Sequence, residues 1–196
     1  MGLNNNEGKL TFVNISNGRL YTKAKDQQPV YYTDIDGTII KVDFAQEEYQ
    51  GKQFEVAKFT MTDRGEKFVL QMRVDSGYFR GFCNGLRSAD PTMQINITPS
   101  YKEKDGKPQT TCFVKQFGKT MKFAFTKDNM GDLPPVEQVT FKGQTQWDGT
   151  KQIEYWKNWL KSIQFTHEAI IEEDRKLITQ PAPHPEPISG ADDLPF

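Results

Sequence analysis

Apolar and polar residues alternate along much of the chain, which is the pattern of half-buried β-strands. In residues 66–74, for example, Phe68, Leu70 and Met72 share one face, while lysine, glutamine and arginine side chains lie on the other. An Asp-Gly pair at 105–106 marks a turn between two such runs. The alternation predicts strands over residues 38–44, 53–62, 66–74, 92–101 and 109–117.

Helical spacing interrupts this alternation at residues 77–88, where Phe79, Phe82, Cys83 and Leu86 recur three and four positions apart. The resulting order is three strands, one helix and two strands. That order is typical of the oligonucleotide-binding (OB) fold, a small antiparallel barrel. We therefore predict a mainly β protein with an OB-fold β-barrel.

Further strands are expected on both sides of this unit. Residues 9–15 and 19–24 flank an Asn-Gly pair at 17–18, which favours a two-residue hairpin turn. Segments 120–126 and 138–145 also carry strand patterns. We expect an N-terminal hairpin extension and two later strands that enlarge the barrel.

A long helix is predicted over residues 150–179, with Asp148 or Thr150 as its cap. This spacing fits a helix that packs on the barrel, and it also fits a heptad-like contact with a second copy or a partner. The sequence leaves both interpretations open. The apolar stripe of this helix consists of Ile153, Trp156, Leu160, Ile163, His167, Ile170 and Leu177.

Prolines at every second position from 181 to 187 favour an extended segment without a core of its own. We expect a disordered acidic tail there. The predicted organisation is therefore a binding domain over 1–147, a C-terminal helix over 148–179 and a tail over 180–196.

Charge is unevenly distributed along the 196 residues. Residues 1–167 hold 23 basic and 19 acidic side chains, whereas residues 168–196 hold 2 and 7. A basic body with an acidic end suits a protein that binds a polyanion, although acidic tails also serve solubility. The chain shows neither a signal peptide nor an apolar run of membrane-spanning length, so we expect a cytoplasmic protein of a bacterial or phage-infected cell.

The strongest catalytic pattern is Asp34-Ile35-Asp36-Gly37-Thr38, which resembles the DxDGT motif of haloacid-dehalogenase-like phosphatases. That motif needs alternating strands and helices around it, and this chain instead predicts consecutive strands. Asp36-Gly37 is also an ordinary hairpin pair. We expect no catalytic residues, no metal site and no cofactor.

A binding surface remains, so we searched for strand faces that combine cations for phosphates with aromatic rings for bases. Phe113 and Phe117 have a second interpretation, as core residues on either side of an outward lysine. Tyr31, Tyr32, Tyr78 and Trp147 fit either role. The candidate DNA-binding residues are Arg19, Tyr21, Lys23, Lys67, Arg73, Lys102, Lys104, Lys107, Phe113, Lys115 and Phe117.

The chain ends in Asp192, Asp193, Leu194, Pro195 and Phe196. This ending resembles the acidic tip of single-stranded DNA-binding (SSB) proteins, which usually carry Ile-Pro-Phe where this chain has Leu-Pro-Phe. The expected barrel differs from the bacterial SSB domain in length and strand motifs, and the linker is rich in proline. The resemblance is therefore to the phage-type SSB proteins.

The resemblance implies a non-enzymatic protein that binds single-stranded DNA without strong sequence preference during replication, recombination and repair. It also implies that residues 192–196 recruit replication and repair proteins. A homo-oligomer is compatible with this picture, and no membrane partner is expected. The alternative is an RNA-binding or recombination-accessory OB-fold protein.

Overall fold

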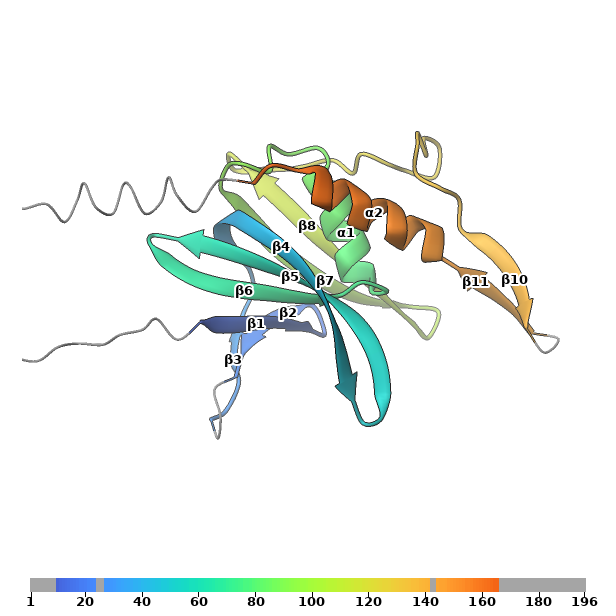
Figure 1. Ribbon diagram of the computed structural model, residues 1–196, viewed down its shortest axis with the longest axis horizontal. Helices are drawn as coiled ribbons and strands as arrows, with labels where there is room; N and C mark the ends of the chain where they lie inside the picture. Colours follow the sequence, from blue (N-terminus) through green and yellow to red (C-terminus); the bar gives the residue numbers. More distant parts are fainter. Residues whose placement is uncertain (1–9, 24–26, 142–143, 166–196) are drawn as a thin grey trace, which may run out of the picture. The chain divides into compact units, whose positions relative to one another are not determined.

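The computed structural model describes residues 10–23, 27–141 and 144–165, which form a mainly β structure with two helices (Figure 1). The strands are β1 (Thr11–Ser16), β2 (Arg19–Thr22), β3 (Val30–Tyr32), β4 (Ile35–Tyr49), β5 (Lys52–Asp63), β6 (Glu66–Arg73), β7 (Ile95–Lys104), β8 (Lys107–Gln116), β9 (Lys119–Thr120), β10 (Glu137–Phe141) and β11 (Gln144–Asp148). The helices are α1 (Gly77–Leu86) and α2 (Thr150–Ser162). The expected order of three strands, one helix and two strands is confirmed by β4 to β8.

Two-residue turns close five hairpins of the main sheet, and each ends in glycine. Both residues of each turn have a positive φ, as type I′ turns require. Such turns match the right-handed twist of the strands and set the pairing register. The turns in the described residues are Asn17-Gly18, Gln50-Gly51, Arg64-Gly65, Asp105-Gly106 and Phe117-Gly118.

One long strand, β4, joins the two halves of the main sheet. Its first residues, 35–37, pair with β7, and residues 38–49 pair with β5. The nine strands follow the order β3-β2-β1-β6-β5-β4-β7-β8-β9, and β1 runs parallel to β6. The curved ribbon of β4 is visible in Figure 1.

The described strands do not close into the barrel that the sequence analysis expected. The hydrogen-bonded order ends at β3 on one side and at β9 on the other. The edge of β6 that does not face β5 pairs with β1, from Thr11 opposite Phe68 to Val13 opposite Leu70. The N-terminal hairpin therefore occupies the edge that would otherwise be available for closure.

The core lies between the sheet and α1. Phe68, Leu70 and Met72 of β6 are buried, which confirms the predicted face. Helix α1 begins at its cap Ser76, whose hydroxyl accepts a hydrogen bond from the Phe79 amide at 3.1 Å. The glycines of α1 allow it to approach β8 closely. A Cβ atom on Gly81, for example, would lie 2.3 Å from the Thr111 hydroxyl.

Helix α2 is shorter than expected. It ends at Ser162, and Ile163 already has an extended backbone, so the predicted continuous helix is wrong at residues 163–165. Residues 166–179 lie outside the described part of the chain. The structure supports packing on the body, because Trp156 and Leu160 are buried in the same core as α1.

One ion pair and one hydrogen bond describe how α2 meets the sheet and how it begins. The Lys157 ammonium lies 2.6 Å from a carboxylate oxygen of Glu55 on β5. Asp148 accepts a hydrogen bond from the backbone amide of Thr150 at 2.8 Å. Hydrogen bonds from Thr150 lower the pKa of the Asp148 carboxyl below its usual value. The residue at the N-cap position is Gly149, and no side chain caps this end of α2, so the predicted cap at Asp148 or Thr150 is wrong.

Three local predictions were wrong. Of segment 120–126, only Thr120 belongs to a strand, because the backbone of Phe125 binds the Asn84 side chain of α1 instead. Segment 138–145 belongs to a hairpin, β10–β11, rather than to one strand. Asp36-Gly37 is not a turn: it lies inside β4, where a Cβ on Gly37 would come within 3.0 Å of the Phe68 ring.

Candidate nucleic-acid interface

A cleft of about 670 Å³ lies where the β4–β5 hairpin faces β2, β6 and α1. We call it the aromatic cleft, because Tyr21, Tyr49, Phe54 and Tyr78 contribute to its lining. Tyr49 is 66% exposed, and it precedes the Gln50-Gly51 turn of the hairpin. The cleft therefore presents aromatic rings to solvent from several strands.

Arg73, from the end of β6, is the one basic side chain among the described residues that line this cleft. Its guanidinium donates two hydrogen bonds to Asp75, at 3.0 Å from Nε and 2.6 Å from Nη2. These bonds raise the pKa of Arg73 above its ordinary value, while burial opposes the shift. The guanidinium also lies 5.1 Å from the centre of the Phe54 ring. Arg73 is thus held in a fixed position beside an aromatic face.

Carboxylates also line the aromatic cleft, and two of them have basic partners. The Glu47 carboxylate lies 2.7 Å from the Lys58 ammonium and also accepts a hydrogen bond from Gln71. Asp75 is paired with Arg73. Glu48 also lines the cleft, so the lining carries three carboxylates and one guanidinium, and the two pairs offset only part of this negative charge.

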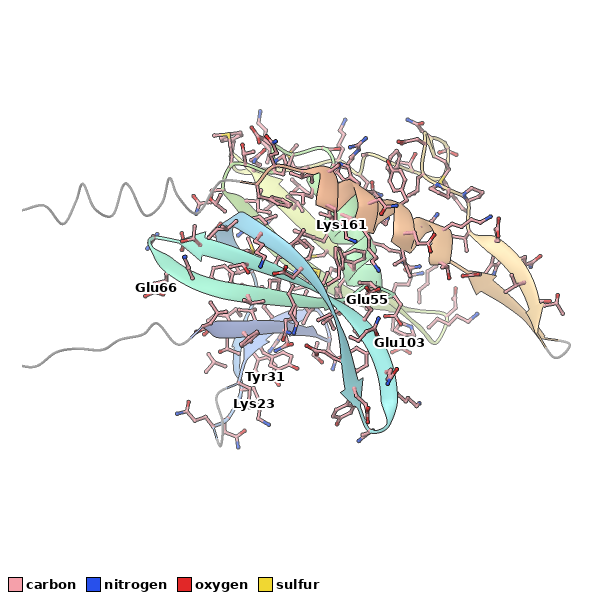
Figure 2. All side chains as sticks on the ribbon, viewed as in Figure 1. Lys23, Tyr31, Glu55, Glu66, Glu103 and Lys161 are labelled. Atoms are coloured by element: carbon pink, nitrogen blue, oxygen red, sulfur yellow. The ribbon has the colours of Figure 1, made fainter. Side chains whose placement is uncertain are left out.

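Arg19 and Tyr21 share one side of β2, and Lys23 follows directly after the end of this strand. Arg19 and Lys23 are exposed, while Leu20 between them points into the core. Tyr21 lies across from Tyr31 on β3, and their ring centres are 5.9 Å apart. Figure 2 shows Lys23 and Tyr31 on the β2–β3 side of the sheet. This side is contiguous with the aromatic cleft through Tyr21.

The three predicted lysines of the 102–107 turn share one face of the β7–β8 hairpin. Lys104 pairs directly with Lys107, and Lys102 pairs with Gln109 on the same face. All three lysines are exposed. Thr110, the next residue along β8, lines the aromatic cleft, but it lies on the opposite face of the strand from Lys107 and Gln109, so the three lysines belong to the other face of the hairpin.

The face that carries Phe113, Lys115 and Phe117 points away from the core. The alternate residues of β8 are the ones that are buried. Phe113 stacks on Phe123 with ring centres 5.9 Å apart. Lys115 and Phe117 instead line a separate groove beside β7. Of the two open interpretations, burial of both phenylalanines in the core is therefore wrong.

Lys67 is not brought to the aromatic cleft. It lines another groove, with Asp34, Asp63 and Glu66 among its neighbours there. Such an acidic lining is poorly suited to phosphate, so the structure separates Lys67 from the other candidates. The predicted residues are thus distributed over several surfaces.

Sequence reasoning missed Tyr49 and Phe54 as cleft residues. Tyr49 directly precedes the Gln50-Gly51 turn, and Phe54 lies three residues after it in β5. An aromatic residue directly before an X-Gly pair at the tip of a long hairpin was the available signal, because such a position cannot reach a core. The predicted tip, residues 192–196, lies outside the described residues.

No family model matches this chain, and comparison with curated proteins and with solved structures finds no similar protein. Within the described residues, no helix has the length and apolar character needed to cross a bilayer. The described part of the chain also contains no cluster of three or more side chains arranged to hold a metal ion.

Proposed function

We propose that this protein binds single-stranded DNA, without strong sequence preference, on an OB-type arrangement of strands β4 to β8. In that arrangement the first strand is long, bends, and pairs with both the second and the fourth, and the helix follows the third. Here β4 pairs with β5 and with β7, and α1 follows β6. The pairing of β1 with β6 makes the proposed OB arrangement an open one.

The observation that carries the proposal is the aromatic cleft. Single-strand binders combine stacking rings with cations along the backbone path, and each stacked base contributes about 1–3 kcal/mol. The cleft offers Tyr21, Tyr49 and Phe54 together with Arg73. Rings stack on any base, so this lining supports binding with little sequence preference.

The lysine-bearing hairpin offers a second surface for an anionic ligand, on the face of β8 opposite to Thr110 of the cleft. Like charges placed directly opposite each other destabilise an antiparallel pair. Lys104 and Lys107 are nevertheless opposite each other, with Lys102 on the same face. Phosphates of a bound strand would offset this repulsion and release counterions.

Residues 192–196 provide the proposed recruitment element. Phe196 serves as the anchor in a hydrophobic pocket of a replication or repair protein, and Asp192 and Asp193 contact its basic rim. The support for this step is the sequence resemblance to the SSB tip together with the acidic composition of residues 168–196.

The test is a titration of the full chain with fluorescently labelled oligo-dT at about 50 mM and about 300 mM salt, where counterion release predicts weaker binding at the higher concentration. RNA and duplex DNA of equal length are the competitors, and single-stranded DNA is expected to compete best. Preferred binding of RNA would support the alternative function. Absence of binding to oligo-dT at low salt would exclude the proposal.

A triple replacement of Lys102, Lys104 and Lys107 by glutamine tests the hairpin. It should flatten the dependence of log K on log salt by about 0.7 for each phosphate that the variant no longer neutralises. The matched control replaces three exposed lysines of other surfaces, Lys41, Lys127 and Lys161, and should change the slope much less.

A further inference from the structure

Phe117 has an unusual backbone conformation for its residue type. It occupies the first position of the β8–β9 turn with a φ of 52°, in the left-handed region that disfavours bulky side chains. Its ring is also 75% exposed, so packing does not compensate for this conformation. The corresponding positions of the other turns are Asn17, Gln50, Arg64 and Asp105. An exposed aromatic residue in a strained turn points to a function at that position.

The strand end that carries this ring is fixed to the body of the protein. Gln116 is only 5% exposed, and its amide group makes two hydrogen bonds with the backbone of Asp90. Nε2 donates to the Asp90 carbonyl at 2.9 Å, and Oε1 accepts from the Asp90 amide at 3.0 Å. Phe117 is the next residue, so its ring projects from a preorganised anchor rather than from a long free loop.

The surroundings of Phe117 suit an unpaired nucleotide. The ring lines a groove of about 580 Å³ that also includes Lys115, Asn96 and the 44% exposed Met93. The Phe117 ring and the Met93 thioether offer apolar surface to a base. The Asn96 amide offers hydrogen bonds to the edge of that base, and the Lys115 ammonium suits a phosphate. Asp36 also lines this groove, and its carboxylate disfavours a phosphate path on its side.

We propose that Phe117 is retained in its strained turn because it stacks on one base of the bound strand, while Lys115 contacts a neighbouring phosphate. This is a second nucleic-acid contact, separate from the aromatic cleft, and it rests on the proposed function. Phenylalanine at this turn position lowers the stability of the fold but contributes to binding. A substitution that relieves the strain should therefore raise stability and lower the affinity for the strand.

The decisive variant is Phe117→Asn, since asparagine tolerates the left-handed region and carries no stacking ring. Relief of strain should raise the melting temperature by about 2 to 4 °C. The affinity for oligo-dT should fall about tenfold. Phe117→Tyr keeps a ring and the strain, so it should bind like the wild type without gaining stability. Gln50→Asn changes the equivalent position of another turn and is the stability control, because it introduces asparagine at a left-handed position without removing an aromatic ring.

The other outcomes are equally informative. Wild-type affinity in Phe117→Asn, with the wild type itself binding oligo-dT, overturns this inference and leaves the proposed function intact. No binding by the wild type overturns both. A lower melting temperature in Phe117→Asn shows that the ring packs on the protein, which overturns the inference. Unchanged affinity together with dissociation of an oligomer in size-exclusion chromatography assigns the ring to a protein interface instead.

Discussion

The backbone amide of Gly18 donates a hydrogen bond of 2.8 Å to the hydroxyl oxygen of Tyr78, which connects the β1–β2 turn to helix α1 across 60 positions of sequence. The turn is also in close contact with β7, because a Cβ on Gly18 would lie 2.7 Å from the backbone nitrogen of Tyr101. These contacts fix the hairpin that carries Tyr21. The Tyr78 hydroxyl therefore contributes to the position of one wall of the aromatic cleft.

Removal of that hydroxyl in Tyr78→Phe leaves the Gly18 amide without its acceptor. An unsatisfied, partly buried donor costs about 1–3 kcal/mol, so we expect a lower free energy of unfolding in urea. The Gly18 amide should also exchange with solvent faster than in the wild type. Tyr32→Phe is the control, because Tyr32 is 44% exposed, and it should change neither quantity. Equal exchange of Gly18 in all three proteins would argue against this connection.

Asp75 limits the charge that Arg73 can offer to a ligand, since both hydrogen bonds of that pair use the guanidinium edge. Asp75→Asn should raise the affinity for oligo-dT about 2- to 5-fold at low salt and steepen its salt dependence. Arg73→Gln should do the opposite. The measurement is a fluorescence titration at several salt concentrations.

The control for net charge is Asp43→Asn, which removes a carboxylate that pairs with Lys41 outside the cleft. Asp43→Asn should raise affinity less than Asp75→Asn does. An equal gain in both variants would show that total charge, rather than the Arg73–Asp75 pair, controls binding.

The two thiols make stability sensitive to alkaline pH. Burial raises the pKa of Cys83 and Cys112 well above the ordinary value of about 9. At a pH below this ordinary pKa, the folded and the unfolded protein both hold the thiol protons, and the thiols contribute to stability in full. Above it, the unfolded chain releases protons that the folded protein retains. The free energy of unfolding should therefore fall by up to about 1.4 kcal/mol per pH unit for each thiol.

Urea titrations at about pH 8, 9 and 10 measure this slope, since the window spans the ordinary thiol pKa. Cys112→Ala removes one titrating group, so its stability should decline less steeply with pH, whatever its absolute value. Identical slopes in the variant and the wild type would contradict the assignment. In the folded protein at pH 8 both thiols should react slowly with a disulfide reagent.

The order of elements was predictable because it depends on local patterns. Alternation in β6 and X-Gly pairs such as Asn17-Gly18 and Asp105-Gly106 predict a strand or a turn without reference to distant residues. Asp36-Gly37 is the exception, because it lies inside β4. The same X-Gly rule would have found the Phe117-Gly118 turn. It was missed because phenylalanine there was interpreted as part of a strand face.

The open sheet and the loop after β9 were not predictable in this way. The parallel pairing of β1 with β6 joins Phe12 to Val69, far apart in sequence, and nothing local distinguishes it from a closed barrel. The alternation of Phe123 and Phe125 suggested a strand. Their actual contacts are Phe113 and Asn84, which only the tertiary structure brings near. The aromatic cleft was incompletely predicted for the same reason.

Deletion of residues 190–196 tests the two proposed roles of the chain separately. The deletion removes Asp192, Asp193 and the terminal hydrophobic residues, so affinity for oligo-dT should stay the same or rise at low salt, and any gain should disappear at about 300 mM salt. Purified replication and repair proteins of the host that bind the full chain should no longer bind the truncated one. Phe196→Ala keeps the charge and removes the anchor, so it should abolish partner binding without changing DNA affinity. Unchanged partner binding after the deletion would refute the role of the tip, whereas loss of DNA binding would place these residues in the DNA site itself.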